Sequence, residues 1–311
     1  MSDPASSTDA ADMKTMTHAR RLAEQTPADR NRYVDLLRAV SIMAVVVGHW
    51  LIAAPVVIDG ETRGINMLAE APWTQWLTWV FQVMPIFFVV GGYSNAASWR
   101  AAAGRGTDYG EWLGSRLRRL VLPAAPLIAV WTGIAAAGQT FGMDRDILRL
   151  GSQAALIPLW FLAVYVIVVA LTPVTLHVWD RFGLRSFVGI AALAAVVDAV
   201  RWQSNEMIGW TNFVFVWAAV HQLGYAWRDG RFAAAGHSAL VGLGGLALLV
   251  ALTTVGPYPV SMVGVPGAVA TNNSPPTIAL IALGVTQAGF LLALESRAQR
   301  ALTKVRPWTA T

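Results

Sequence analysis

Three ionisable side chains in the first hydrophobic stretch of the sequence have types and spacings suited to chemistry: Asp35, Arg38 and His49. Arg38 and His49 are 11 residues apart. In a helix, with about 100° and 1.5 Å per residue, this spacing places both on one face, about 16 Å apart. Asp35 lies one turn before Arg38. Because ionisable groups inside a membrane helix are costly, they usually face a bundle interior or a wet cavity, which makes these groups candidates for a site.

A histidine and an arginine on one face could together transfer a group to an alcohol. A neutral imidazole in an apolar site can take the proton of a hydroxyl group as a general base, or attack as a nucleophile. The guanidinium of Arg38 offers a charged, planar set of donors for a phosphate, a carboxylate or a developing oxyanion. The alternative is structural: Asp35 and Arg38 form an interfacial ion pair, and His49 is hydrogen-bonded inside a helix bundle.

The composition excludes most water-soluble folds. Of the 311 residues, 55% are hydrophobic and 13% are charged, whereas a soluble domain carries about 25% charged residues. The chain has no cysteine, which excludes disulfides, thiolate metal sites and cysteine nucleophiles. The natural solvent of such a chain is a lipid bilayer.

Long hydrophobic stretches predict the membrane helices, because a helix needs about 20 apolar residues to cross a bilayer. They occupy residues 36–54, 74–97, 120–138, 153–176, 184–200, 207–227, 235–255 and 277–294. We therefore expect an all-α, polytopic integral membrane helix bundle with these eight transmembrane helices. The expected organisation is a disordered cytoplasmic tail at 1–33, a membrane domain at 34–296 and a basic cytoplasmic tail at 297–311.

The positions of lysine and arginine predict the orientation. With a cytoplasmic N-terminus, the outer loops hold only Arg63, Arg145, Arg149 and Arg201 of the 23 basic residues, which matches the positive-inside rule. We expect a multi-pass protein of the plasma membrane whose N-terminus is cytoplasmic. The net charge of +5 then indicates contact with anionic membrane lipids, and no nucleic-acid partner is expected.

The first stretch also resembles a known family. It opens as Tyr-Val-Asp-Leu-Leu-Arg-Ala-Val-Ser-Ile over residues 33–42, and ten residues separate Arg38 from His49. This pattern is similar to the first membrane helix of the membrane acyltransferase-3 family. The resemblance implies transfer of an acetyl or other short acyl group from cytoplasmic acyl-CoA to a carbohydrate, lipid or small molecule of the cell envelope. It implies His49 as base or nucleophile and Arg38 as positioning group.

Three further segments resemble motifs of the same family. Met84–Tyr93 resembles a paired-Phe and Ser-Gly motif, although Gly91 stands where serine is common, so this position lacks the hydroxyl. Arg116–Pro123 resembles a basic motif at the start of the third helix. Pro158–Leu162, with the tyrosine three residues later, resembles a Trp-Phe-Leu motif of the fourth helix. The four motifs together cover residues 32–165 in order.

Two features concern the rest of the chain. The uncharged outer loop at 256–277 is similar to loops of actinobacterial-type members of the family. Family members usually have more membrane helices than the sequence predicts here, so we expect a C-terminally shortened chain. If the missing helices complete the cavity, such a chain keeps its fold without full activity.

The resemblance also suggests which residues meet the substrates. Arg116, Arg118 and Arg119 are expected to bind the phosphates of acyl-CoA through charge-assisted bonds, with fixing the topology as the alternative role. The residues expected to line the substrate cavity are Asp35, Phe88, Tyr93, Trp160 and His221, of which His221 is alternatively a hydrogen-bonded structural histidine. We expect acetyl-CoA as co-substrate, an envelope glycan or lipid as acceptor, no tightly bound cofactor and no metal.

Two other classes of protein remain open. A secondary transporter could use Arg38, His49 and His221 to line a substrate or proton pathway. Broken helices and inverted repeats would favour it, and neither is evident in the sequence. A membrane scaffold without chemistry would need His49 only for stability or association.

Overall fold

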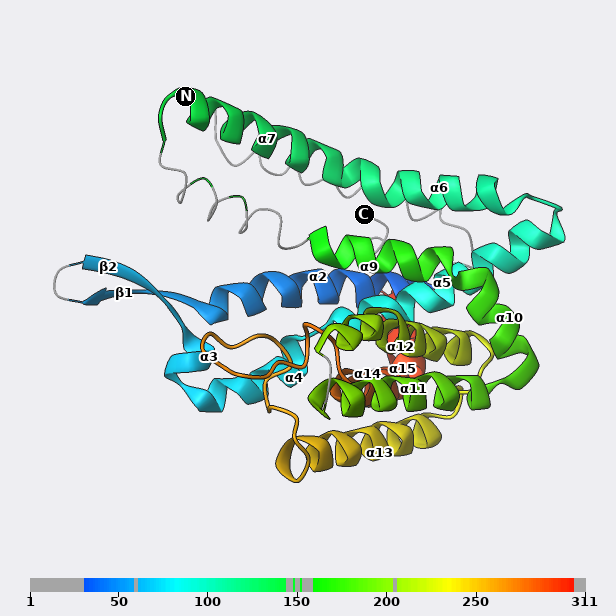
Figure 1. Ribbon diagram of the computed structural model, residues 1–311. Coiled ribbons are helices and arrows are strands. Elements are labelled where there is room, and N and C mark those ends of the chain that lie inside the picture. Colours follow the sequence, from blue (N-terminus) through cyan, green and yellow to red (C-terminus); the bar gives the residue numbers. More distant parts are fainter. Residues whose placement is uncertain are drawn as a thin grey trace, which may run out of the picture.

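The computed structural model describes residues 31–58, 61–143, 148, 152, 159–203 and 206–304, and these residues form an all-α membrane protein (Figure 1). The main helices are α2 (Arg32–Ile52), α5 (Met84–Gly104), α6 (Tyr109–Val121), α7 (Ala125–Thr140), α9 (Leu159–Ala170), α10 (Thr172–Phe182), α11 (Leu184–Gln203), α12 (Asn212–Arg228), α13 (Ala235–Thr254), α14 (Ile278–Ala293) and α15 (Glu295–Lys304). The predicted all-α fold is confirmed. Most of the tail predicted at 1–33, and the end of the tail predicted at 297–311, lie outside the described residues.

Short elements connect the first two membrane helices. Two antiparallel strands, β1 (Ala53–Ile58) and β2 (Glu61–Asn66), follow α2. After them come α3 (Met67–Glu70), the 3-10 helix η1 (Pro72–Leu77) and α4 (Thr78–Phe81). The sequence analysis did not predict the strand pair, although the Val-Val-Ile run of β1 has the β-branched composition that favours strands.

Four described segments are long and apolar enough to cross a membrane: Arg32–Ile52, Pro72–Gly104, Tyr109–Thr140 and Ala235–Thr254. The bent pairs α9 with α10, at 54°, and α14 with α15, at 50°, raise the number to six if each pair forms one span. Eight spans were expected, so two predicted stretches need comment. α11 carries Arg185, Asp198 and Arg201, and α12 has 17 residues, at the short end of the range for a membrane-crossing helix, so these two helices are not among the candidates.

The third span is one rod with a local break. α6 and α7 are joined by the 3-10 helix η2 (Leu122–Ala124) and run almost in line along one side of the bundle (Figure 1). Pro123 lies at this joint, where its ring and its missing N–H disturb the regular hydrogen-bond pattern of a helix. The rod packs against the body of the protein through α6, which contacts α9. The contact between α6 and α9 also holds the arginines of α6 against the bundle.

α12 occupies the centre of the bundle, packed against α5, α9, α10, α11 and α14. Every residue from Val216 to Trp227 is buried. At its closest approach to α5, β-carbons at Gly92 and Gly224 would overlap with backbone atoms of the opposite helix, namely the carbonyl oxygens of His221 and Val89. Small residues at such crossings let two membrane helices pack backbone to backbone. This contact fixes the position of α5, which carries part of the site.

A buried carboxylate links several helices at the end of the bundle where α12 and α14 begin. Asp198 of α11 accepts hydrogen bonds from Asn212 Nδ2 at 3.0 Å, from Tyr258 Oη at 3.1 Å and from the backbone N–H of Ile278 at 2.9 Å. Burial and the nearby carboxylate raise the pKa of the Tyr258 phenol, so Tyr258 remains a donor. Asp198 therefore joins α11, α12, α14 and the loop before α14.

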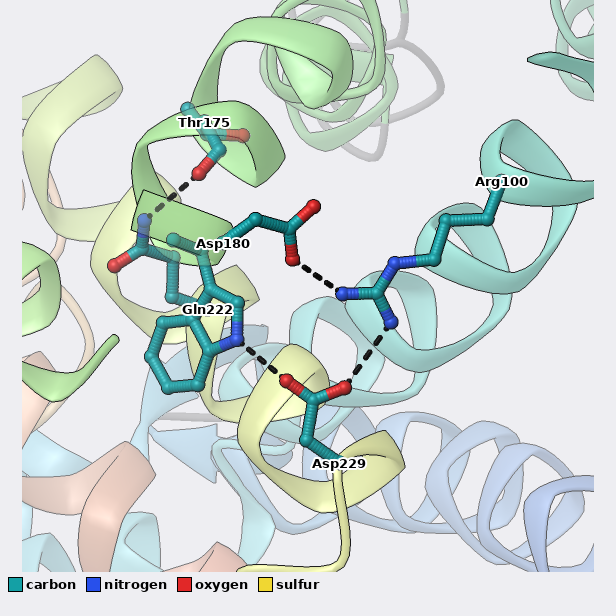
Figure 2. A network of polar contacts seen from close by, with 6 residues as sticks. Arg100, Thr175, Asp180, Gln222 and Asp229 are labelled. Carbon is teal, nitrogen blue, oxygen red and sulfur yellow. Dashed lines mark hydrogen bonds and ion pairs between the residues drawn. The ribbon is translucent and has the colours of Figure 1, made fainter. Parts of the chain in front are cut away.

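An ion-pair network joins α5 to α10 and α12 (Figure 2). Arg100 donates from Nη2 to Asp180 Oδ1 at 2.5 Å and from Nη1 to Asp229 Oδ1 at 3.1 Å. The other oxygen of Asp229 accepts from the indole N–H of Trp179 at 2.7 Å. Because both of its terminal nitrogens are engaged, Arg100 serves as a cross-link between helices.

Candidate functional site

A cavity of about 330 Å³ lies where four helices meet. Its lining residues come from α2, α5, α6 and α9: Arg38, Ile42, Phe87, Val90, Gly91, Ser94, Asn95, Arg116, Arg119, Leu120, Phe161, Leu162 and Tyr165. Three of these residues carry guanidinium groups and three carry aromatic rings. The cavity is therefore positively charged on the side of α2 and α6, whereas α5 and α9 contribute aromatic and aliphatic side chains together with the neutral polar groups of Ser94, Asn95 and Tyr165.

Arg38 enters the cavity from the first half of α2. Its Nη2 donates to Ser94 Oγ of α5 at 2.8 Å, and its Nη1 lies 3.7 Å from Asp35 Oδ1. The side chain of Arg38 is 47% exposed, so its guanidinium remains accessible to a ligand. Asp35 contacts the site through Arg38, as the spacing of these residues on one helix face requires.

Arg116 and Arg119 enter the cavity from α6. Arg116 Nε donates to Ser98 Oγ of α5 at 3.1 Å, and the same oxygen accepts the indole N–H of Trp112 at 2.8 Å. The neutral hydroxyl of Ser98 thus orients Arg116 without neutralising its positive charge, which can still attract an anion. The spacing i, i+3 places Arg119 beside it on one face, while Arg118 is exposed and does not line the cavity. Of the three arginines predicted to act together, two line the cavity and Arg118 points elsewhere, because adjacent residues of a helix lie on different faces.

Aromatic side chains form the wall opposite the arginines. The ring centroids of Phe87 and Phe161 are 5.7 Å apart, and those of Phe161 and Tyr165 are also 5.7 Å apart. Phe88 lies behind this wall, buried, with its ring stacked on Trp217 at 4.4 Å and edge-on to Tyr165 at 5.5 Å. Phe88 therefore supports the cavity wall without lining the cavity.

A chain of buried polar groups leads away from the wall. Asn95 Nδ2 donates to Tyr165 Oη at 3.4 Å and lies 3.3 Å from His221 Nε2. His221 Nδ1 lies 3.0 Å from Tyr225 Oη, which is 2.9 Å from Thr175 Oγ1. His221 is completely buried. The structural role considered for His221 fits this geometry, and its connection to the cavity runs through Asn95.

His49 lies near the other end of α2, exposed and outside the lining of this cavity. Ile42, which lines the cavity, precedes it by two helical turns, so the two share a face about 10 Å apart. The Nδ1 of His49 is 2.7 Å from the carbonyl oxygen of Val45. Because a carbonyl oxygen only accepts, Nδ1 carries the proton in the neutral ring and Nε2 has a free lone pair. Nε2 is thus the nitrogen that can act as a base or nucleophile.

The other predicted cavity residues lie beside the cavity. Tyr93 packs on Trp227, with ring centroids 4.4 Å apart, and Arg228 lies over its ring. The ring centroids of Trp160 and Phe213 are 6.0 Å apart. Both rings pack against neighbouring helices. The residues that directly follow them in the chain, Ser94 and Phe161, line the cavity.

Sequence reasoning missed the polar residues that α5 contributes. Ser94 and Asn95 line the cavity together with Tyr165. A signal for them exists, because adjacent polar side chains in an apolar membrane helix are expected to face a partner or a cavity. Their partners, Arg38 and His221, lie on other helices and become evident only in the folded chain.

The arrangement is suited to binding an anion and to proton transfer. Guanidinium groups beside a low-dielectric wall bind phosphate or carboxylate strongly, and an imidazole with a free Nε2 lies further along α2. In a comparison with protein families, a model described as an acyltransferase domain matches residues 31–309. No curated protein and no solved structure matched the chain.

Proposed function

The chain belongs to the membrane acyltransferase-3 family, and from this premise we propose that it transfers a short acyl group from acyl-CoA to a hydroxyl group of an envelope carbohydrate, lipid or small molecule. Membership supports a membrane acyltransferase in general. The observation that carries the choice of donor is the cavity lined by Arg38, Arg116 and Arg119 beside an aromatic wall. Coenzyme A combines phosphates with a long, mostly uncharged arm, and this cavity offers a surface for each.

In the proposed binding mode the donor lies along α2. Arg116 and Arg119 bind its phosphates, because their guanidinium groups face the cavity and form charge-assisted hydrogen bonds with phosphate oxygens. The pantetheine arm passes Ile42, and the thioester lies near His49. The separation of Arg38 and His49 along the helix, about 16 Å, is comparable with the length of an extended arm.

The chemical step uses His49 as a general base. Its Nε2 removes the proton of the acceptor hydroxyl, and the hydroxyl oxygen bonds to the thioester carbonyl carbon while the carbon–sulfur bond breaks. The coenzyme A thiolate leaves and receives a proton from the imidazolium, so that an ester and free coenzyme A result. The contact of Nδ1 with Val45 O supports this role by fixing the tautomer. Attack by His49 itself, giving an acyl-imidazole that the acceptor then cleaves, is the second chemical route.

The proposed localisation follows from the donor and from the charges. Acyl-CoA is cytoplasmic, so the arginine cavity opens toward the cytoplasm, where the positive-inside rule places the basic residues of α6. α2 then begins at the cytoplasmic side of the plasma membrane. The acyl group is carried along α2 toward His49 and the envelope acceptor.

Acetyl-CoA binding to the purified protein in nanodiscs tests the proposed donor. Replacing Arg116 by alanine removes a charged hydrogen-bond partner, worth about 1.5–3 kcal/mol, and should raise Kd about 10- to 150-fold. Arg119→Ala should act in the same direction. Arg105, an exposed residue just after α5, provides the control, because Arg105→Ala removes the same charge away from the cavity and should leave Kd within about twofold.

Arg118→Ala distinguishes the cavity from the charge of α6 as a whole. Arg118 is exposed and outside the cavity lining, so its loss should weaken binding far less than loss of Arg116. Equal losses for the two variants would contradict the proposed binding mode. No saturable binding of acetyl-CoA by folded wild-type protein would contradict the donor itself.

A further inference from the structure

Tyr165 occupies the space that a side chain at position 91 would need. An ideal β-carbon built on Gly91 would lie 2.5 Å from Tyr165 Oη and 2.7 Å from Tyr165 Cε2. Both distances are shorter than any ordinary van der Waals contact, so a serine at position 91 is incompatible with this position of Tyr165. Gly91 and Tyr165 both line the cavity. In this chain the hydroxyl at this point of the wall therefore comes from α9 instead of α5.

The direction of the hydrogen bonds around Tyr165 shows where its own proton is free to point. Tyr165 Oη accepts from the amide nitrogen of Asn95. The same amide donates to His221 Nε2, which leaves His221 Nδ1 as the donor to Tyr225 Oη. Tyr225 in turn donates to Thr175 Oγ1, whose own proton goes to the carbonyl oxygen of Leu171 or of Thr172.

All hydrogen bonds of this chain run in the same direction, with the donor always on the side of Asn95 and the acceptor on the side of Thr175. Each group donates to the next, so none of them needs the phenolic proton of Tyr165. Tyr165 uses a lone pair toward Asn95, and no other residue in the described part of the chain accepts its O–H, which is therefore available to a ligand. The buried network thus holds the hydroxyl as an oriented donor at the cavity wall.

We propose that Tyr165 binds the acyl donor by donating a hydrogen bond to an amide carbonyl oxygen of the pantetheine arm. The inference rests on the proposed function. A neutral O–H among Phe161, Leu162 and Val90 suits a neutral carbonyl oxygen, whereas the phosphates are matched by the charged groups of α2 and α6. The amides of the arm follow the phosphates along coenzyme A, and Tyr165 lines the same cavity as the three arginines, so a donor whose phosphates bind the arginines brings its amides within reach of the hydroxyl.

Two ligands, one with the pantetheine arm and one without it, test this assignment. Coenzyme A carries the pantetheine arm, whereas adenosine 3′,5′-bisphosphate is the adenosine with its 3′- and 5′-phosphates and lacks the arm. In nanodiscs, Tyr165→Phe should raise the Kd of coenzyme A about 3- to 10-fold, the effect of losing one neutral hydrogen bond. It should leave the Kd of the bisphosphate unchanged. Tyr109→Phe is the matched control, because it removes a hydroxyl that donates to Ala170 O and lies outside the cavity.

The outcomes separate this inference from the proposed function. If wild-type protein binds coenzyme A, Arg116→Ala weakens that binding and Tyr165→Phe leaves it unchanged, the role of Tyr165 is wrong and the proposed donor stands. If Tyr165→Phe weakens coenzyme A and the bisphosphate equally, the hydroxyl acts on the phosphate end or on the fold, and the inference is overturned. If wild-type protein binds neither ligand, the proposed donor fails and the role of Tyr165 fails with it.

A second variant tests the same hydroxyl without deleting it. Gly91→Ala should displace Tyr165, because the new β-carbon would meet Oη first. The expected result is weaker coenzyme A binding in the wild-type background and a smaller further loss in the Tyr165→Phe background. Equal losses in both backgrounds would show that Gly91 acts independently of the hydroxyl and would contradict the inference.

Discussion

At the residue scale, Arg38 shows how a charged group can be positioned and still remain available. One terminal nitrogen donates to Ser94 Oγ, and the other lies 3.7 Å from Asp35. These contacts set the plane of the guanidinium without burying it. The remaining N–H groups of the planar fork can meet an anion in the cavity.

Arg38→Lys tests the planar fork and keeps the charge. A lysine ammonium cannot contact Ser94, Asp35 and a ligand in the same geometry, so we expect kcat/KM for acetyl-CoA to fall about 10-fold. The measurement is steady-state release of coenzyme A in nanodiscs. Arg105→Lys serves as the control at an exposed position. Full activity of Arg38→Lys would show that only the charge matters.

The residue types of the site could be predicted from the sequence, but their grouping could not. Arg38, Arg116 and Arg119 were expected, and all three line one cavity. Tyr93 was expected to line it as well, yet its ring packs on Trp227. One position in a helix turns a side chain by about 100°, so the choice between adjacent residues such as Tyr93 and Ser94 depends on helix rotation, which a hydrophobic pattern defines only coarsely.

At the scale of elements, the contact between α5 and α12 determines where the cavity wall lies. Gly92 and Gly224 face each other at the crossing, and Asn95 and His221, which contact each other, each lie three residues from these glycines on the same two helices. Length and hydropathy predicted both helices. Their close approach depends on which faces meet, and that information is spread over residues far apart in the chain.

Gly92→Ala tests this crossing. Its methyl group would overlap with the carbonyl oxygen of His221, and forcing the helices apart should lower the free energy of unfolding by about 1–3 kcal/mol. Unfolding in a denaturing detergent measures the change. Gly114→Ala is the control, since a β-carbon at Gly114 of α6 would meet no atom within 4 Å. Similar stabilities for the two variants would contradict the packing described for the α5–α12 crossing.

At the scale of the whole molecule, the two ends of α5 define two sides of the bundle. The loop before α14 reaches the start of α5, where the indole N–H of Trp79 donates to Val260 O at 2.8 Å and Gln82 Nε2 donates to Met262 O at 3.3 Å. Gly104 lies at the other end of this helix of 21 residues, about 30 Å away. The loop and Gly104 should therefore face opposite sides of the membrane.

The lack of native cysteine allows a direct test of the orientation. Val269 in the loop is fully exposed, and Gly104 has open space around it. In intact cells a membrane-impermeant maleimide should label Val269→Cys, and it should label Gly104→Cys only after permeabilisation. The reverse pattern would place the arginine cavity on the outer side and contradict a cytoplasmic donor.

The proposed reaction depends on acyl-CoA as the donor and on His49 as the reactive base or nucleophile. Coenzyme A release from acetyl-CoA, with water taking the place of the acceptor hydroxyl, should be measured for the purified wild type and for His49→Ala in nanodiscs, together with acetyl-CoA binding to the same samples. We expect release by the wild type, a loss of about 100- to 10,000-fold in His49→Ala, and retained binding because His49 lies outside the arginine cavity. Equal release by the two folded proteins would contradict the proposed reaction.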